Sequence, residues 1–200
     1  AEERSFDPCL IARARIGIAQ VHAESQNPAQ ASSALNLASS GLLACSASDR
    51  LDLTLLAADL WLALQEEERA SAVLRRELKM QPDHLLLQSR MAQIAFIAGD
   101  WTRSRDALGF CLASTDATRT NEQQVEWLSY MIQLDIIEGI ASNDSLVASF
   151  ESLIAGIRLE KAQAQREQIY GLIALQGNHL KAFDWAKTIL KFTPTEAMDQ

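Results

Sequence analysis

Valine, threonine, glycine and proline are all scarce in this chain of 200 residues. Val occurs four times and Thr eight times, whereas Ala occurs 31 times and Leu 28 times. A β-sheet protein of this size uses more β-branched residues, so the composition argues against a sheet. With only 8 Gly and 4 Pro there are few tight turns, and 48% hydrophobic residues exclude an intrinsically disordered chain. The composition predicts an all-α fold.

Cysteine is also scarce, and its three copies exclude a disulfide scaffold. The number is odd, no CxxC motif occurs, and no cysteine is close to a histidine in sequence. We therefore interpret Cys9, Cys45 and Cys111 as small buried side chains in helices. A Cys9–Cys45 bridge between neighbouring helices is the alternative in an oxidising compartment.

Positive charge and long apolar runs are missing as well. The net charge is −8, the pI is near 4.9, and no cationic cluster is longer than Arg75-Arg76. Nucleic-acid binding needs a concentrated positive face, so we expect none. No apolar run approaches the roughly 18 residues that span a bilayer, so we expect no membrane insertion. The start at Ala1 fits a processed protein or a trimmed domain, and the composition fits the cytoplasm or a bacterial periplasm.

Signatures of catalysis and of metal binding are absent from the sequence. The histidines His22, His84 and His179 stand alone, without HExxH or HxH motifs. The run Glu66–Glu68 falls where a helix begins, where carboxylates favour the helix dipole. There is no GxSxG motif and no glycine-rich phosphate loop. We expect no enzyme activity, no cofactor and no metal. The helical positions of the four tryptophans favour a role in packing over a role in a ligand pocket. They are Trp61, Trp101, Trp127 and Trp185.

Helical periodicity and capping signals predict about ten helices with short connections. Asp83 and Asp100 are expected N-caps, and Thr120 to Gln123 has the spacing of a capping box. After a first helix, the expected ranges are 28–46, 49–64, 67–80, 83–98, 101–114, 121–140, 144–157, 160–176 and 179–192.

Two consecutive blocks of 34 residues, 51–84 and 85–118, share a pattern of small and bulky residues. In the first block, small Ala58 and Ala70 and bulky Leu74 fall at positions 8, 20 and 24. In the second block, Ala92, Ser104, Leu108 and Cys111 fall at positions 8, 20, 24 and 27, and Gly99-Asp100-Trp101 makes the turn. A third block, 163–196, follows with Ile169, Ile173, Gly177, Ala182 and Pro194.

These blocks resemble tetratricopeptide repeats. The resemblance implies a right-handed α-α superhelix of about ten antiparallel helices, forming a single domain over residues 1–200. Degenerate hairpins are expected at 10–46, with Gly17 and Ala29 at positions 8 and 20, and at 121–158. The chain departs from the family where Glu77 stands at the small position 27, and the tryptophan of position 4 is absent throughout.

In tetratricopeptide repeats the first helix of each repeat lines a concave groove, so the resemblance implies a partner-binding face here. The surface is mixed, and only Arg90 and Gln93 resemble the residues of a carboxylate clamp, which argues against a clamp. The mixture suits an amphipathic helix or an apolar peptide. The candidate groove residues are Leu55, Asp59, Leu62, Ser89, Arg90, Gln93, Phe96, Ile97 and Glu167.

The sequence thus favours a non-enzymatic scaffold or adaptor that binds a protein or a peptide. Three alternatives stay open. One is a chaperone like the small acidic ones of bacterial type III secretion, and another is a sensor domain of a larger transcriptional regulator. An all-helical enzyme is the third. The oligomeric state and the partner are not indicated.

Overall fold

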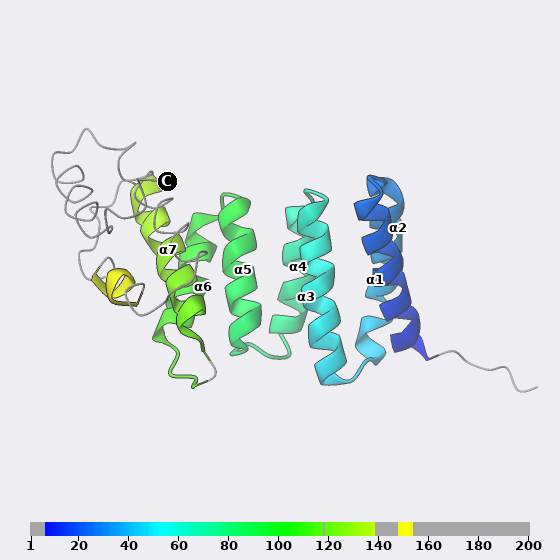
Figure 1. Cartoon of the computed structure of the whole chain (residues 1–200). Helices are drawn as coiled ribbons and strands as arrows, with labels where there is room; N and C mark the ends of the chain where they lie inside the picture. The colour runs from blue at the N-terminus through cyan, green and yellow to red at the C-terminus, as the bar shows by residue number, and fades with distance from the viewer. Residues whose placement is uncertain (1–6, 118, 139–147, 154–200) are drawn as a thin grey trace, which may run out of the picture. The chain divides into compact units, whose positions relative to one another are not determined.

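The computed structural model describes residues 7–117, 119–138 and 148–153, and these residues contain helices and no strand (Figure 1). The predicted all-α class is therefore confirmed for them. The chain divides into two compact units, Ala1–Cys111 and Leu112–Gln200. Residues 148–153 are also helical. The elements are α1 (Pro8–Glu24), α2 (Pro28–Ser39), the 3₁₀ helix η1 (Leu42–Ala44), α3 (Ala47–Ala63), α4 (Glu67–Leu78), α5 (Leu85–Ile97), α6 (Trp101–Ala113) and α7 (Asn121–Ile137).

The helices of the first unit are paired in hairpins, and one type of turn joins the two helices of each hairpin. After α1, α3 and α5 the chain passes through a single residue with positive φ: Gln26, Gln65 and Gly99 respectively. The N–H of the following residue then bonds to a carbonyl in the last turn of the helix, for example Glu66 to Trp61 at 2.9 Å and Asp100 to Ala95 at 2.9 Å. This is the Schellman arrangement, and the next helix begins at once.

Small buried residues let the two helices of each hairpin approach closely. Ala58 and Ala70 are fully buried in the α3–α4 hairpin, and Ala92 and Ser104 hold the same places in the α5–α6 hairpin. The Ser104 hydroxyl donates to the Ala92 carbonyl at 2.9 Å. The expected burial at these positions is confirmed, as it is for Trp61, Leu74, Met91, Leu108 and Cys111.

The first hairpin buries a different pair of residues from the pair expected. Gly17 and Ala29 are exposed, and a Cβ added to Gly17 would meet nothing within 4 Å. The buried pair is Ala19 and Ala31, so the expected register was wrong by two residues. With that shift, Leu35 and Ala38 become the buried equivalents of Leu74 and Glu77. The hairpin repeats after 39 residues instead of 34, because η1 and its flanks lengthen the connection.

Two helix ends also differ from the expectation. The helix predicted over 28–46 ends at Ser39, and Ser46 instead caps α3 by accepting from the Asp49 N–H at 3.2 Å. Gly41 lies against α1 so closely that a Cβ there would be 2.6 Å from the Pro8 carbonyl oxygen. The N-cap of α5 is His84 and not Asp83.

The other capping predictions are confirmed. The Arg103 N–H donates to the Asp100 carboxylate at 3.2 Å. Thr120 and Gln123 form the reciprocal capping box at the start of α7, with bonds of 2.9 and 3.2 Å. The acidic run also behaves as expected, since Glu67 and Glu68 occupy the first turn of α4.

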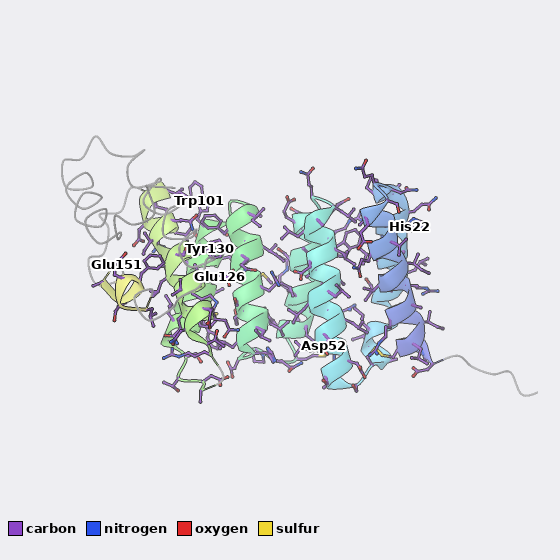
Figure 2. All side chains as sticks on the ribbon, viewed as in Figure 1. His22, Asp52, Trp101, Glu126, Tyr130 and Glu151 are labelled. Carbon is purple, nitrogen blue, oxygen red and sulfur yellow. A yellow bond between two sulfur atoms is a disulfide. The ribbon has the colours of Figure 1, made fainter. Side chains whose placement is uncertain are left out.

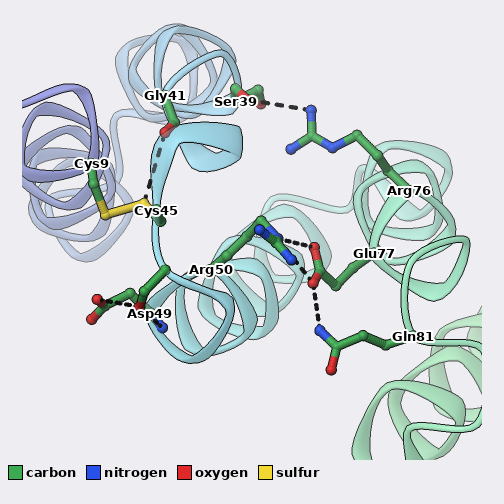
Figure 3. A network of polar contacts seen from close by, with 10 residues as sticks. Cys9, Ser39, Gly41, Cys45, Asp49, Arg50, Arg76, Glu77 and Gln81 are labelled. Carbon is green, nitrogen blue, oxygen red and sulfur yellow. Dashed lines mark hydrogen bonds and ion pairs between the residues drawn. A yellow bond between two sulfur atoms is a disulfide. The ribbon is translucent and has the colours of Figure 1, made fainter.

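Polar contacts and a disulfide link helices of the first unit to one another and to the segments beside them (Figure 3). Glu77 is only 1% exposed, and both of its carboxylate oxygens accept from Arg50 Nε, at 3.0 and 3.1 Å. Gln81 donates to the same carboxylate at 2.7 Å. Glu77, which stands where the repeat pattern has a small residue, is therefore a buried charge whose carboxylate is bound by Arg50 and Gln81. Cys9 and Cys45 form the disulfide that the sequence left as an alternative.

Helix packing in the first unit places the first helices of the hairpins next to one another. α1 packs against α2 and α3, and α5 packs against α3 and α4. Figure 1 shows α1, α3 and α5 in succession. In the second unit, α7 buries Val125, Trp127 and Leu134. The block 163–196 and the helices expected over 160–176 and 179–192 lie outside the described residues, as does most of 144–157.

Candidate functional site

The candidate groove residues of α3 and α5 lie on a face that neither helix buries. Leu55, Asp59 and Leu62 of α3 are half-buried, and on α5 Ile97 is 53% exposed. The remaining α5 residues of the set, Ser89, Arg90, Gln93 and Phe96, are half-buried. Asp52 begins the same face of α3 and is exposed (Figure 2). Glu167 lies outside the described residues.

A charged cluster joins the two helices at the middle of this face. Arg90 Nε lies 3.1 Å from Asp59 Oδ1, and Arg90 also donates to Gln93 Oε1 at 2.6 Å. Partial burial raises the pKa of Asp59 above its ordinary value, and the Arg90 charge offsets part of that rise. The structure therefore brings together three residues that the sequence placed separately on the groove.

The apolar side chains of this face divide into those that contact the core and those that stay exposed. Leu55 and Leu62 pack against the core of the unit, so much of their surface is already used. The exposed apolar side chains on α3 and α5 are Leu56, Leu86 and Ile97. Leu56 is three residues from Asp59 on α3. Leu86 is four residues from Arg90 and Ile97 is four residues from Gln93 on α5. Residues at these spacings share a helix face, so the face has a mixed apolar and polar character.

The structure also bears on metal ligands and nucleophiles within the described residues. They contain no group of three His, Cys, Asp or Glu side chains that could hold a metal ion. Burial raises the pKa of the Cys111 thiol to about 12, so it is not a nucleophile at neutral pH. Trp61 and Trp127 are buried, as packing predicts, whereas Trp101 is exposed and Trp185 is not described. Within the described ranges no helix is long and apolar enough to span a membrane.

A second candidate site, which the sequence analysis missed, is a cleft of about 240 Å³ in the first unit. Its walls are Asn36 and Ser39 of α2 and Arg69, Val73 and Arg76 of α4, with Trp61 of α3 between them. The α4 part was readable from the sequence, because 69, 73 and 76 share a helix face. The α2 wall was not, because the first hairpin was placed in the wrong register.

The chain was also compared with known proteins. No family model, no curated protein and no solved structure matches it.

Proposed function

We propose that this chain binds a partner protein through an amphipathic segment that docks on the face of α3 and α5. The observation that carries the proposal is the division of each helix into two faces. Every groove position on α3 and α5 keeps solvent access, whereas the opposite face of each helix is buried. A surface helix normally turns a polar face to water, but this face keeps Leu56, Leu86 and Ile97 exposed.

The fold that we propose is a divergent tetratricopeptide-like superhelix, right-handed as in that family. The recurring turn after α1, α3 and α5 supports it, as do the small residues buried at equivalent places in the three hairpins. Hairpins of this kind stack through their apolar faces and leave one row of helices free for a ligand. The proposed role is therefore a scaffold or an adaptor that acts by binding.

The mixed surface indicates what the partner segment looks like. Apolar side chains of an amphipathic helix would contact Leu86 and Ile97, and its polar groups would meet Asp59 and Arg90. The Asp59–Arg90 pair is already formed at 3.1 Å, so its charges add selectivity for a partner more than affinity.

The test is affinity capture from source-cell lysate with three forms of the full chain. The first is the wild type, and the second is Leu86→Asp/Ile97→Asp, which places charges on the exposed apolar part of the face. The third is Leu37→Asp on α2, a matched control because Leu37 is 54% exposed and Ile97 is 53% exposed. Circular dichroism verifies that all three forms are folded.

We expect one protein to be retained by the wild type and by Leu37→Asp, and lost by the double variant. A peptide from that protein should then bind the wild type in solution with the same dependence on the face. Equal retention by all three folded forms would contradict the proposal, and so would the absence of any specifically retained protein.

A further inference from the structure

The cleft between α2 and α4 is a positively charged site in an acidic protein. Arg69 and Arg76 both line it, and none of the described residues in its walls is acidic. The chain as a whole carries a net charge of −8. Two guanidinium groups line the cleft and no carboxylate lies among the described residues of its walls, so the local charge favours an anionic ligand.

The present partners of the two arginines leave most of their donors available. Arg69 stacks on the Trp61 ring, 4.9 Å from its centroid, and its Nε is 3.4 Å from Glu66 Oε2. Arg76 donates one long bond of 3.3 Å to the Ser39 carbonyl. A guanidinium has five N–H donors in a planar fork that matches a carboxylate. These contacts orient both side chains at the cleft without neutralising them fully.

The spacing along α4 selects the shape of the ligand. Arg69 and Arg76 are seven residues apart, which is about 10 Å along a helix axis. The residues between them on the same face are Ala72 and Val73, which offer only apolar contact. The cleft is thus positive at two ends and apolar in the middle.

We propose that this cleft binds a small organic dianion that carries carboxylates at the two ends of a short hydrocarbon chain. Each carboxylate pairs with one arginine, and the hydrocarbon packs on Val73. The cleft has a volume of about 240 Å³, which is enough to hold a molecule of this size. This site is separate from the α3–α5 face and does not depend on the proposed function.

The test is calorimetric titration of the full chain with adipate at low ionic strength. Adipamide has the same length without charge, and hexanoate has one charged end. Arg69→Gln and Arg76→Gln each remove one cation from the cleft. Arg75→Gln is the matched control, because Arg75 is an exposed residue of the same helix that does not line the cleft.

We expect adipate to bind the wild type and the Arg75→Gln variant equally, and more tightly than hexanoate or adipamide. Each cleft variant should lose about tenfold or more in affinity, the usual effect of losing one charge-assisted pair. Amide NMR shifts on adding adipate should centre on Ala72 and Val73. The proposal is overturned if adipate does not bind, or if the Arg75→Gln and Arg76→Gln variants lose the same affinity.

Discussion

Glu77 illustrates how one side chain can depart from a repeating pattern without disturbing the packing. The equivalent residues in the neighbouring hairpins are Ala38 and Cys111, both small and buried. Glu77 fits because Arg50 and Gln81 satisfy its carboxylate inside the unit. A buried ion pair adds little net stability, but loss of one partner leaves an uncompensated charge.

We therefore expect Arg50→Met to lower the free energy of unfolding by about 3–5 kcal/mol, because it leaves the Glu77 carboxylate buried and unpaired. The double variant Arg50→Met/Glu77→Met should recover most of that loss. Urea denaturation followed by circular dichroism measures both variants. If the double variant were as unstable as Arg50→Met, the unpaired Glu77 charge would not be the cause of the lost stability.

The Asp59–Arg90 pair makes a prediction about protonation. Burial raises the pKa of Asp59, and Arg90 lowers it, so Arg90→Gln should raise the pKa further. Carboxyl NMR titration of the wild type and the variant measures this directly. Since the folded state then favours the protonated acid, the stability of the variant should decrease as the pH rises through the pKa of Asp59. An unchanged or lower pKa would contradict the pairing.

At the scale of elements, the positive φ of the turn after α5 favours glycine, although Gln26 and Gln65 adopt it in the equivalent turns, and the middle of α1 does not favour glycine. Gly99 has a φ of +74°, and Gly17 lies inside a helix; added Cβ atoms would meet nothing within 4 Å at either place. We expect Gly99→Ala to lower the stability by about 1 kcal/mol through backbone strain. Gly17→Ala should raise it by about 0.5–1 kcal/mol, because alanine favours the helix. Thermal or urea unfolding compares the two, and equal signs would contradict the assigned backbone conformations.

The predictable part of the fold lies in the elements with strong local signals. Periodicity placed α3 to α6 to within two residues, and capping chemistry placed the starts of α6 and α7. The end of α2 was not predictable, because the approach of Gly41 to Pro8 is a tertiary contact. The register of the first hairpin was missed because Gly17 and Ala29 have the same spacing as the buried Ala19 and Ala31.

The candidate site, like the fold, was predictable from the sequence only in part. The sequence identified the residues of the α3–α5 face because they share a helix face. It did not predict the Asp59–Arg90 contact, which requires α3 to lie against α5. Which apolar side chains of the face contact the core is set by tertiary packing: Leu55 and Leu62 do, whereas Leu56 and Leu86 stay exposed.

At the scale of the whole molecule, the Cys9–Cys45 disulfide ties the start of α1 to the segment before α3, across 36 residues. A cross-link over a loop of this length stabilises the folded state by about 4 kcal/mol in the chain-entropy model. Bonds of this kind form and persist in oxidising environments.

We expect the denatured, unreduced chain to contain one reactive thiol, that of Cys111, and the native chain to contain none, because burial raises the pKa of Cys111 to about 12. A thiol-reactive dye counts them. Reductant should lower the urea midpoint of the wild type and leave that of Cys9→Ser/Cys45→Ser unchanged. Three thiols in the unreduced chain would contradict the bridge.

The most direct test of the central claim is hydrogen–deuterium exchange of the full chain with and without the partner that the capture experiment retains. If the partner docks on the proposed face, protection should increase in α3 and α5 and stay unchanged in α2 and α4. Protection confined to α2 and α4 would contradict the claim, because it would place the partner away from Asp59, Arg90 and Ile97.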